Sequence, residues 1–332
     1  MRRATPFQDF VIRCVRYAFA NMPAFIGRVF FSKEVALPFL RFRMLRHGYL
    51  KCPILWREVS MPNFKGVWIT SDSSKKPDVV VYYCHGGGFA MGSSYFYMEF
   101  LLAWVTLLRE AGFKNPALFA LDYTLVPDAV FPKQVQQTFA GYNYVLSIIE
   151  DPSRVCVAGD SAGSTLILSM LLVLADHSDY LDRLPQLAVM ISPWVTIISA
   201  KNQNTTSDYL DQKSLSLYGR YYVGSKVSPH DARVSPGECR DLNLWKRSSP
   251  SCGWLFLFGS EEVLAPACRD LIQMLEKSGV EVNVHEEQGS IHAWPVAALY
   301  LGETREARLH GLRRIVSAMQ DKFMNGRERN EI

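Results

Sequence analysis

Several features that mark large protein classes are missing from this chain of 332 residues. Its seven cysteines are odd in number and form no Cys-x-x-Cys pair, which excludes a disulfide framework and a cysteine-rich zinc site. No stretch approaches the roughly 20 uninterrupted apolar residues of a membrane span. A formal net charge of +4 is too small to indicate a nucleic acid as the main partner. With 48% hydrophobic residues, the chain instead has enough apolar side chains for one large buried core.

We also expect no secretory leader in this sequence. Arg2 and Arg3 precede an apolar region, but Asp9, Arg13 and Arg16 interrupt that region, and no small-residue cleavage site follows it. Scattered cysteines without a pairing pattern are typical of proteins in reducing compartments. We therefore expect a cytoplasmic protein without a signal peptide or a transmembrane span.

The first fifty residues are expected to be mainly helical and basic. Apolar residues recur at steps of three and four from Phe7 to Ala18, and eight arginines lie between Arg2 and Arg46. Two interpretations are open: a helical cap over an active site, or an amphipathic segment on a membrane surface. We favour the cap, formed by residues 1–53, because apolar residues continue through residues 23–40. Peripheral membrane contact through the basic N-terminal helix stays the alternative.

From about residue 54 the pattern becomes an alternation of strands and helices. The run at residues 79–84 is continuously β-branched and aromatic, as in a strand that is covered on both faces. The alternation predicts an α/β fold with a mostly parallel sheet and helices on both faces, within a single domain over residues 1–332. The expected strands are Leu55–Met61, Gly66–Thr70, Val79–Cys84, Ala117–Asp122, Arg154–Ala158, Leu187–Ser192, Trp254–Phe258 and Val280–His285. The expected helices are Phe96–Ala111, Lys133–Ile149, Ser164–Ala175, Pro266–Ser278 and Trp294–Phe323.

One interval, residues 199–250, breaks this rhythm. It is polar, has little periodicity and lies between two expected strands. So long a connection within a compact domain often forms a lid or a binding loop. We therefore expect a cap or lid insertion over about residues 199–250.

The pentapeptide Gly159-Asp160-Ser161-Ala162-Gly163 lies between an expected strand and an apolar helix. Glycines on both sides of a serine allow a turn so tight that it lifts the hydroxyl out of the sheet. A serine presented in this way is a nucleophile for acyl transfer. Because an isolated match is as often an ordinary turn, the rest of the chain must supply an oxyanion hole, an acid and a histidine.

A glycine loop, His85-Gly86-Gly87-Gly88-Phe89, directly follows the strand that ends at Cys84. The backbone N–H groups of Gly87 and Gly88, with that of Ala162 as a third, are candidate donors to an oxyanion. A phosphate loop is excluded, because Met91 stands where its last glycine is needed and no Gly-Lys-Ser/Thr follows. A plain glycine turn stays the alternative.

The candidate base is His292, which follows the last expected strand at the edge of the sheet where α/β sites gather. The strand Trp254–Phe258 leads into Glu261 and Glu262, and spacing alone does not separate these two candidates for the acid. The chain order of serine, acid and histidine is the one found in α/β-hydrolases.

As a set, these motifs resemble the hormone-sensitive-lipase-like branch of the α/β-hydrolases, near arylacetamide deacetylases and fungal steryl-acetate deacetylase-like proteins. The glycine loop is similar to the H-G-G-G signature of this family, and Gly159–Gly163 to its G-D-S-A-G signature. Residues 122–128 with Phe131-Pro132 resemble its Y-x-L-x-P-E…F-P segment, and Ser192-Pro193-Trp194 resembles its S-P-W. The matching segments run from about residue 78 to 294.

The resemblance implies an α/β-hydrolase fold in which the N-terminal helices and residues 199–250 form the cap. It also implies that Glu262, in the family's G-x-x-D-x-L position, is the acid rather than Glu261. Glutamate in place of the usual aspartate is one departure from the family, and Pro266, where a second acid is common, is another.

We expect a serine esterase in which Ser161, Glu262 and His292 form the triad and Gly87, Gly88 and Ala162 the oxyanion hole. The expected substrate is an apolar acyl or acetyl ester of small size, with no cofactor and no metal. A biosynthetic acyltransferase, thioesterase or cyclase with the same triad is the alternative. A non-catalytic small-molecule receptor on this fold is less favoured. The gibberellin-receptor relatives of the family lack the catalytic histidine, whereas His292 is present in this chain. Candidates for an apolar pocket, with core packing as the alternative, are Phe89, Met91, Tyr95, Phe96, Trp194 and Trp294.

Overall fold

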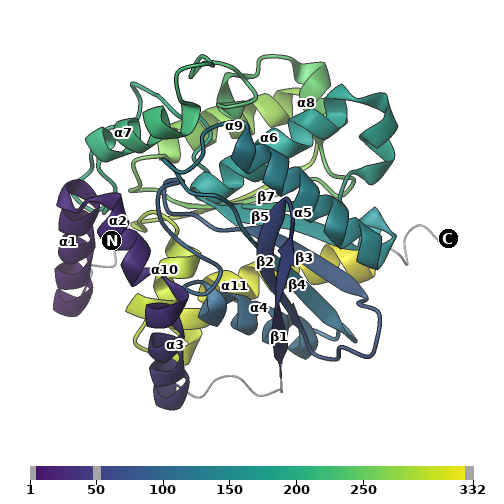
Figure 1. Cartoon of the computed structure of the whole chain (residues 1–332), viewed down its shortest axis with the longest axis horizontal. Helices are drawn as coiled ribbons and strands as arrows, with labels where there is room; N and C mark the ends of the chain where they lie inside the picture. The colour runs from purple at the N-terminus through teal and green to yellow at the C-terminus, as the bar shows by residue number, and fades with distance from the viewer. Residues whose placement is uncertain (1–4, 48–53, 326–332) are drawn as a thin grey trace.

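The computed structural model describes residues 5–47 and 54–325 (Figure 1). Its eight-stranded sheet has the order β1-β2-β4-β3-β5-β6-β7-β8. The six strands from β4 to β8 in this order are parallel, whereas β2 pairs antiparallel with both β1 and β4. The expectation of a mostly parallel sheet is confirmed. The strands are β1 (Leu55–Met61), β2 (Phe64–Thr70), β3 (Val79–Cys84), β4 (Pro116–Asp122), β5 (Val155–Asp160), β6 (Leu187–Ile191), β7 (Trp254–Gly259) and β8 (Val282–Glu287).

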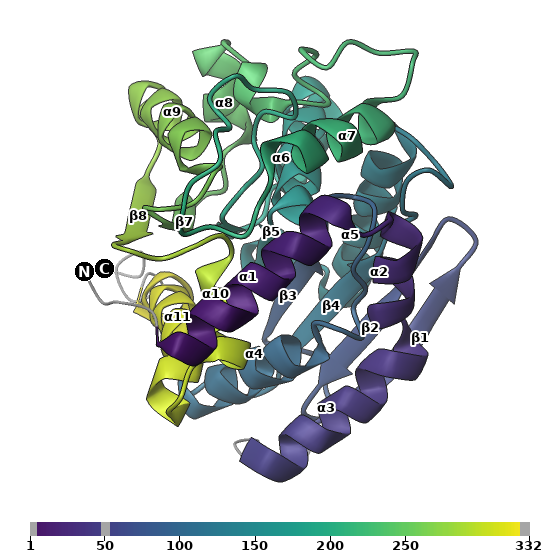
Figure 2. The same cartoon turned by 90° about the vertical axis from the view of Figure 1, so that its left-hand side faces the viewer.

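The central strands are buried because their side chains alternate between two apolar layers. In β3, Val80 and Tyr82 belong to one layer, whereas Val79 and Val81 belong to the other. The two groups of helices that cover these layers lie on opposite faces of the sheet, as Figure 2 shows. The first layer is covered by α5 (Lys133–Ile149), α6 (Ala162–Asp176), α8 (Leu242–Ser248) and α9 (Ala265–Lys277). The second is covered by α4 (Met98–Glu110), α10 (Trp294–Leu301) and α11 (Arg305–Gln320).

The last expected helix, Trp294–Phe323, was wrong as a single element. The chain leaves α10 at Gly302, and α11 begins after Thr304, whose hydroxyl accepts a hydrogen bond from an amide in the first turn. A glycine after one helix and a threonine before the next are ordinary end and start signals. The apolar spacing continues through both helices, and it concealed the break between them. Short helical turns are η1 (Pro152–Arg154), η2 (Ser178–Arg183), η3 (Pro236–Glu238) and η4 (Asp321–Asn325).

Three N-terminal helices precede the sheet: α1 (Pro6–Asn21), α2 (Ala24–Phe30) and α3 (Lys33–His47). They lie together along one side of the molecule, at the front of Figure 2. The expectation of a mainly helical N-terminal segment is thus confirmed for the described residues, while Arg2 and Arg3 lie outside them. Across residues 5–47 and 54–325, no helix has the length and apolar character needed to cross a membrane.

The interval 199–250 contains two helices that differ in their surroundings. The first, α7 (Gln212–Val223), packs against α1. The second, α8, packs against α6 and α9, and its Trp245 ring lies 6.2 Å from that of Trp254. Only the first half of the interval, up to α7, therefore lies with the N-terminal helices, whereas α8 is part of the main core.

Candidate active site

Ser161 occupies a tight turn between β5 and α6, with φ +50° and ψ −118°. A Cβ at Gly159 would lie 2.7 Å from a backbone atom of Gly163. A Cβ at Gly163 would lie 2.0 Å from the carbonyl oxygen of Cys84. Both positions therefore require glycine, and the close approach at Gly163 sets the first turn of α6 against the end of β3. The backbone N–H of Ser161 donates to the carbonyl of Ile191, at 2.9 Å.

Backbone strain is concentrated at this edge of the sheet. Of the five non-glycine residues with positive φ in the described chain, one, Glu150, ends a helix. The other four follow β3, β5, β6 and the loop after β8. Such conformations persist only where the surroundings hold them, and they gather at functional sites. These four residues are Phe89, Ser161, Ser192 and Ala293.

The glycine loop after β3 has the geometry that only glycine permits. Gly87 has φ +106°, and a Cβ there would lie 2.1 Å from the carbonyl oxygen of Met91. Gly88 has φ +62° and faces Tyr218 of α7. The first turn of α6 lies against the start of this loop, because a Cβ at Gly163 would meet the carbonyl oxygens of Cys84 and His85. This loop and that turn carry the three residues that the sequence predicts as oxyanion donors.

Asp160, which sequence reasoning did not single out, holds the glycine loop against the serine turn. Its carboxylate accepts hydrogen bonds from Gly86 N at 2.8 Å and from the hydroxyls of Tyr83 and Tyr97, at 2.6 and 2.7 Å. Burial raises the pKa of Asp160, while the two tyrosine hydroxyls oppose that rise. The one signal in the sequence was an acid at the end of an apolar strand, beside the candidate nucleophile.

Glu262 and His292 form a buried pair at the ends of β7 and β8. Their exposed fractions are 2% and 3%, and Glu262 Oε2 lies 3.7 Å from His292 Nδ1. The same carboxylate oxygen accepts hydrogen bonds from Ser192 Oγ at 2.6 Å and from Gly259 N at 3.3 Å. Glu261 instead interacts with the segment at residues 205–207. The structure thus brings Glu262, and not Glu261, to the histidine.

Opposing effects act on the pKa of each member of this pair. Burial lowers the pKa of His292, but the carboxylates of Glu262 and Asp208 raise it, and the net direction is above the ordinary value of 6.5. Burial raises the pKa of Glu262, while His292 and the hydroxyl of Ser192 lower it, with a net rise. The imidazole therefore keeps its proton to a higher pH than a free histidine does.

Asp208 joins the loops that carry the acid and the histidine. It is fully buried, and its carboxylate accepts from His292 N at 3.1 Å and from Val263 N at 2.8 Å. Its carbonyl oxygen accepts in turn from Nε of Arg16 on α1, at 2.7 Å. Ser192 makes a second link between the two loops, because its hydroxyl donates to Glu262 and accepts from Ala293 N at 2.9 Å. The sequence analysis noted Ser192 only as part of a family motif, without this role, and Asp208 carried no signal within its polar segment.

The N-terminal helices and α7 cover the site at the carboxyl ends of the parallel strands. The Tyr209 ring stands edge-on to His292, with centroids 5.8 Å apart. Phe19 of α1 meets Tyr218 of α7 at 5.6 Å, above Gly88. Ser161 consequently exposes only 5% of its surface.

Most of the aromatic residues that were candidates for an apolar pocket serve as core. Phe89 stacks on Tyr222, with ring centroids 3.8 Å apart, and packs against Trp194. Phe89 and Trp194 are fully buried, and Trp294 exposes 6%. The aromatic side chains next to the candidate site come from residues 199–223 instead: Tyr209 lies against His292, and Tyr218 faces Gly88.

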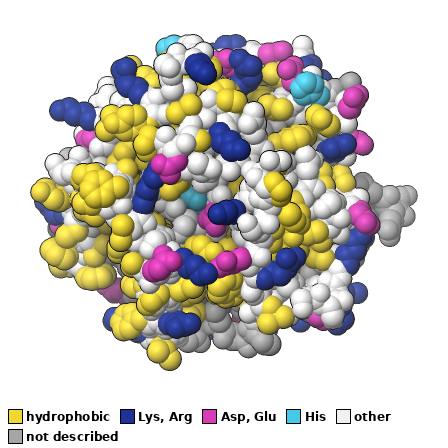
Figure 3. All heavy atoms as spheres, in the orientation of Figure 1, with side chains coloured by type: hydrophobic (Ala, Val, Ile, Leu, Met, Phe, Trp, Pro, Cys, Tyr) yellow, Lys and Arg dark blue, Asp and Glu magenta, His cyan; other side chains and the backbone are white. Residues whose placement is uncertain are grey.

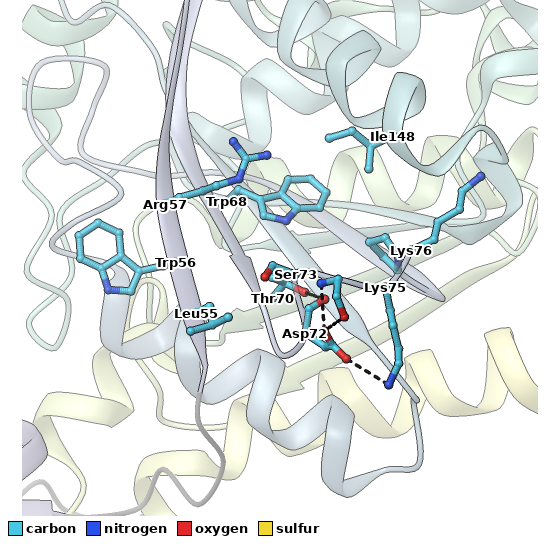
Figure 4. A pocket seen from close by; sticks show the side chains of 12 residues that line it. Leu55, Trp56, Arg57, Trp68, Thr70, Asp72, Ser73, Lys75, Lys76 and Ile148 are labelled. Carbon is cyan, nitrogen blue, oxygen red and sulfur yellow. Dashed lines mark hydrogen bonds and ion pairs between the residues drawn. The ribbon is translucent and has the colours of Figure 1, made fainter.

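A depression of about 500 Å³ lies at the opposite end of the sheet (Figure 4). Trp68 and Ile148 line one side of it, while Asp72 and Lys75 form an ion pair of 3.1 Å on the other. It is formed by β1, β2 and the loop before β3, next to the amino ends of the parallel strands. The depression is therefore remote from Ser161.

One group in the described chain has the composition of a metal site. His285 and Glu287 of β8 and His310 of α11 each offer a ligand atom, and these atoms lie within 4.8 Å of one another. His285 Nε2 lies 2.8 Å from Glu287 Oε2. None of the three belongs to the candidate triad.

Comparisons with known proteins identify the family and the fold. A family profile described as the α/β hydrolase fold matches residues 81–296, from β3 to α10. An acetyl-hydrolase of Streptomyces hygroscopicus is 33% identical over 229 residues, which are 68% of this chain and 71% of that protein. Steryl acetyl hydrolase 1 of Saccharomyces cerevisiae is 25% identical over 73% of this chain, and the chain spans 60% of that protein.

A solved structure is similar over nearly the whole chain. The crystal structure of an esterase from the bacterial hormone-sensitive lipase family matches 97% of this chain and 99% of its own, with a TM-score of 0.74. The sequence identity is 24%, so this likeness concerns the fold. It includes the N-terminal helices, which lie outside the residues matched by the family profile.

Proposed function

The chain belongs to the α/β-hydrolase fold family and is a carboxylic ester hydrolase, and from this premise we propose that it cleaves its ester through an acyl-enzyme on Ser161. One observation carries the proposal. The strained Ser161 turn, the glycine loop and the buried pair of Glu262 and His292 lie at the same edge of one sheet. The carboxyl ends of β3, β5, β7 and β8 supply them.

In the first half of the reaction, neutral His292 takes the hydroxyl proton of Ser161 as the serine oxygen bonds to the ester carbonyl carbon. The N–H groups of Gly87, Gly88 and Ala162 hold the negative charge that develops on the carbonyl oxygen. Glu262 stabilises the imidazolium. The tetrahedral intermediate then collapses, and the alcohol leaves with the proton from His292.

In the second half, water attacks the acyl-enzyme. His292 takes a proton from that water, a second tetrahedral intermediate forms in the same donor loop, and the acid product leaves as Ser161 regains its proton. Without the Ser161 hydroxyl, neither formation nor hydrolysis of the acyl-enzyme can take place.

The proposed substrate is an apolar ester with a small acyl group, such as an acetyl ester. Two curated relatives are named for acetyl-ester hydrolysis. The cap aromatics Tyr209 and Tyr218, next to His292 and Gly88, supply apolar surface on the side from which a substrate enters. A series of p-nitrophenyl esters of increasing chain length measures the size of the acyl site.

The Ser161→Ala variant tests the nucleophile. We expect kcat for p-nitrophenyl acetate to fall by about 10⁶, because the remaining donors and binding groups accelerate hydrolysis only weakly without the nucleophile. A fluorophosphonate probe should label the native protein and not the variant. Ser169→Ala, on the same helix α6, is the control and should keep both activity and labelling. Labelling of Ser161→Ala, or hydrolysis at the native rate, would reject the proposal.

Transfer of the acyl group to an alcohol is a second candidate, and the burial of Ser161 and His292 favours it. A site that excludes water protects an acyl-enzyme from hydrolysis. To test for transfer, the protein is incubated with p-nitrophenyl acetate as acetyl donor and a panel of apolar alcohols as possible acceptors. A hydrolase yields acetate throughout, whereas a transferase yields the acetyl ester and turns over faster as the alcohol concentration rises.

A further inference from the structure

The N-terminal helices expose an unusual amount of apolar surface. Twelve of the 21 large hydrophobic side chains that are exposed in the described chain lie on α1, α2 or α3. They include Phe10 at 65%, Phe25 at 66% and Leu45 at 89% exposure. Figure 3 shows apolar side chains gathered along the left side of the molecule, where these three helices lie. Contiguous apolar surface of this kind marks an interaction site.

Helical spacing places these side chains on continuous faces. On α1, Phe7, Phe10 and Tyr17 are separated by three and seven residues, which puts them on one side of the helix. On α3, Phe39 and Phe42 follow the same rule. The surface is therefore formed by three neighbouring helices, and on α1 its aromatic side chains share one side of the helix.

The helices that form this surface carry more positive than negative side chains. The three helices carry seven arginine and lysine residues against two acidic residues. Arg41 and Arg46 are exposed beside Phe42 and Leu45 on α3. Aromatic and apolar residues next to arginine are the composition of helices that lie in the interface of an anionic membrane, where the guanidinium reaches the head groups.

The same helices are fixed to the candidate active site. Arg28 of α2 donates from Nε to the carbonyl of Ala90, directly after the glycine loop, at 3.1 Å. Arg16 of α1 donates to the carbonyl of Asp208. The apolar surface is thus the outer side of the elements that cover Ser161.

We propose that α1, α2 and α3 form a docking face for an anionic lipid bilayer. Their aromatic side chains enter the interface, and Arg41 and Arg46 contact the head groups. The face goes beyond the proposed esterase function, and only one consequence rests on that function: an apolar ester dissolved in the bilayer enters the site without crossing water.

Vesicle flotation tests the docking face with the whole chain. The native protein should float with vesicles of phosphatidylcholine and phosphatidylserine and should release them as salt is raised. The variant Phe10→Glu/Phe25→Glu/Phe42→Glu should lose binding by about tenfold or more, because charge replaces the groups that enter the interface. Arg41→Gln should weaken binding about fivefold for these vesicles and leave vesicles of phosphatidylcholine alone unaffected. Leu242→Glu, an exposed apolar position on α8, is the control and should bind like the native protein.

Hydrolysis of soluble p-nitrophenyl acetate shows that each variant is folded, and it should be unchanged in the Phe→Glu and Leu242→Glu variants. Ser161→Ala should still bind vesicles, so failure of the esterase proposal and failure of the docking face are separate results. The proposal is overturned if the native protein stays unbound, or if the triple variant floats like the native protein. It is equally overturned if light scattering gives a native dimer that the triple variant dissociates, because the face then joins two copies of this chain.

Discussion

At the scale of single residues, the candidate site depends on carboxylates that never touch the ester. Asp160 fixes the glycine loop to the Ser161 turn, and Asp208 fixes the acid loop to the histidine loop. Both act through backbone N–H groups, so their effect is to hold donors and bases in position. Positioning errors of about 1 Å are enough to reduce turnover strongly.

Asp208→Asn should lower kcat by about 10- to 100-fold with little change in KM. The amide keeps one acceptor oxygen, so only one of the two loops stays attached. Asp241→Asn, which affects an N-cap on α8, is the matched control and should leave kcat unchanged. If kcat of Asp208→Asn equalled that of the native protein in stopped-flow and steady-state assays, the bridge would have no role in positioning.

The pH dependence of kcat/KM reports the charge state of His292. The imidazole is a base only when neutral, and its pKa is raised, so activity is lost as the pH falls through a midpoint above 6.5. In Glu262→Gln the carboxylate that raises this pKa is gone while burial still lowers it, and the midpoint should move to lower pH. The pH dependence of kcat/KM for a soluble ester, measured for the native protein and for Glu262→Gln, compares the two midpoints. A midpoint that rises in the variant would contradict the assigned pair.

At the scale of elements, a buried ion pair attaches α3 to α4. Arg43 donates from Nη2 to Glu99 Oε1 at 2.8 Å and makes a second bond to the other oxygen. The guanidinium also lies 4.8 Å from the centre of the Tyr300 ring. The pair therefore joins α3 both to α4 and to α10.

Arg43→Met should lower the free energy of unfolding by about 3 kcal/mol, because it removes the cation from beside a buried carboxylate. Arg43→Met/Glu99→Leu should recover most of that loss. Arg46→Met, an exposed position on the same helix, is the control and should stay within about 0.5 kcal/mol of the native protein. Urea unfolding measures all three, and a stable single variant would show that α3 is held by other contacts.

Elements were predictable from the sequence where burial imposes a pattern. Leu55–Met61, Val79–Cys84 and Lys133–Ile149 have the bounds that the sequence predicts. The prediction Val280–His285 for β8 began and ended two residues early. This strand lies at the edge of the sheet, where Glu286 and Glu287 are half-exposed and need not be apolar. The polar interval before β7 concealed α7 and α8, because most of its residues face water or other loops.

At the scale of the whole molecule, the sequence predicted the architecture and the chain order of the candidate triad, but not how its parts are held together. Strand alternation and short motifs are local, so they can be read directly. The partners of Asp208 lie up to 192 residues away in the chain, and only the folded topology brings them within hydrogen-bond distance. The carboxyl ends of the parallel strands gather Ser161, Glu262 and His292 at one edge, and the depression at β1 and β2 lies at the other.

The origin of Asp208 has a consequence for engineering. The carboxylate that fixes the two loops comes from the segment leading into α7, and Arg16 of α1 holds its backbone. Cap and site are therefore not separate modules that can be exchanged freely between homologous enzymes. A chimera that replaces residues 199–223 with another protein's segment keeps its turnover only if the graft brings an acid to this position. An exchange of this segment that aims to change the substrate range must therefore keep an aspartate at the position of Asp208.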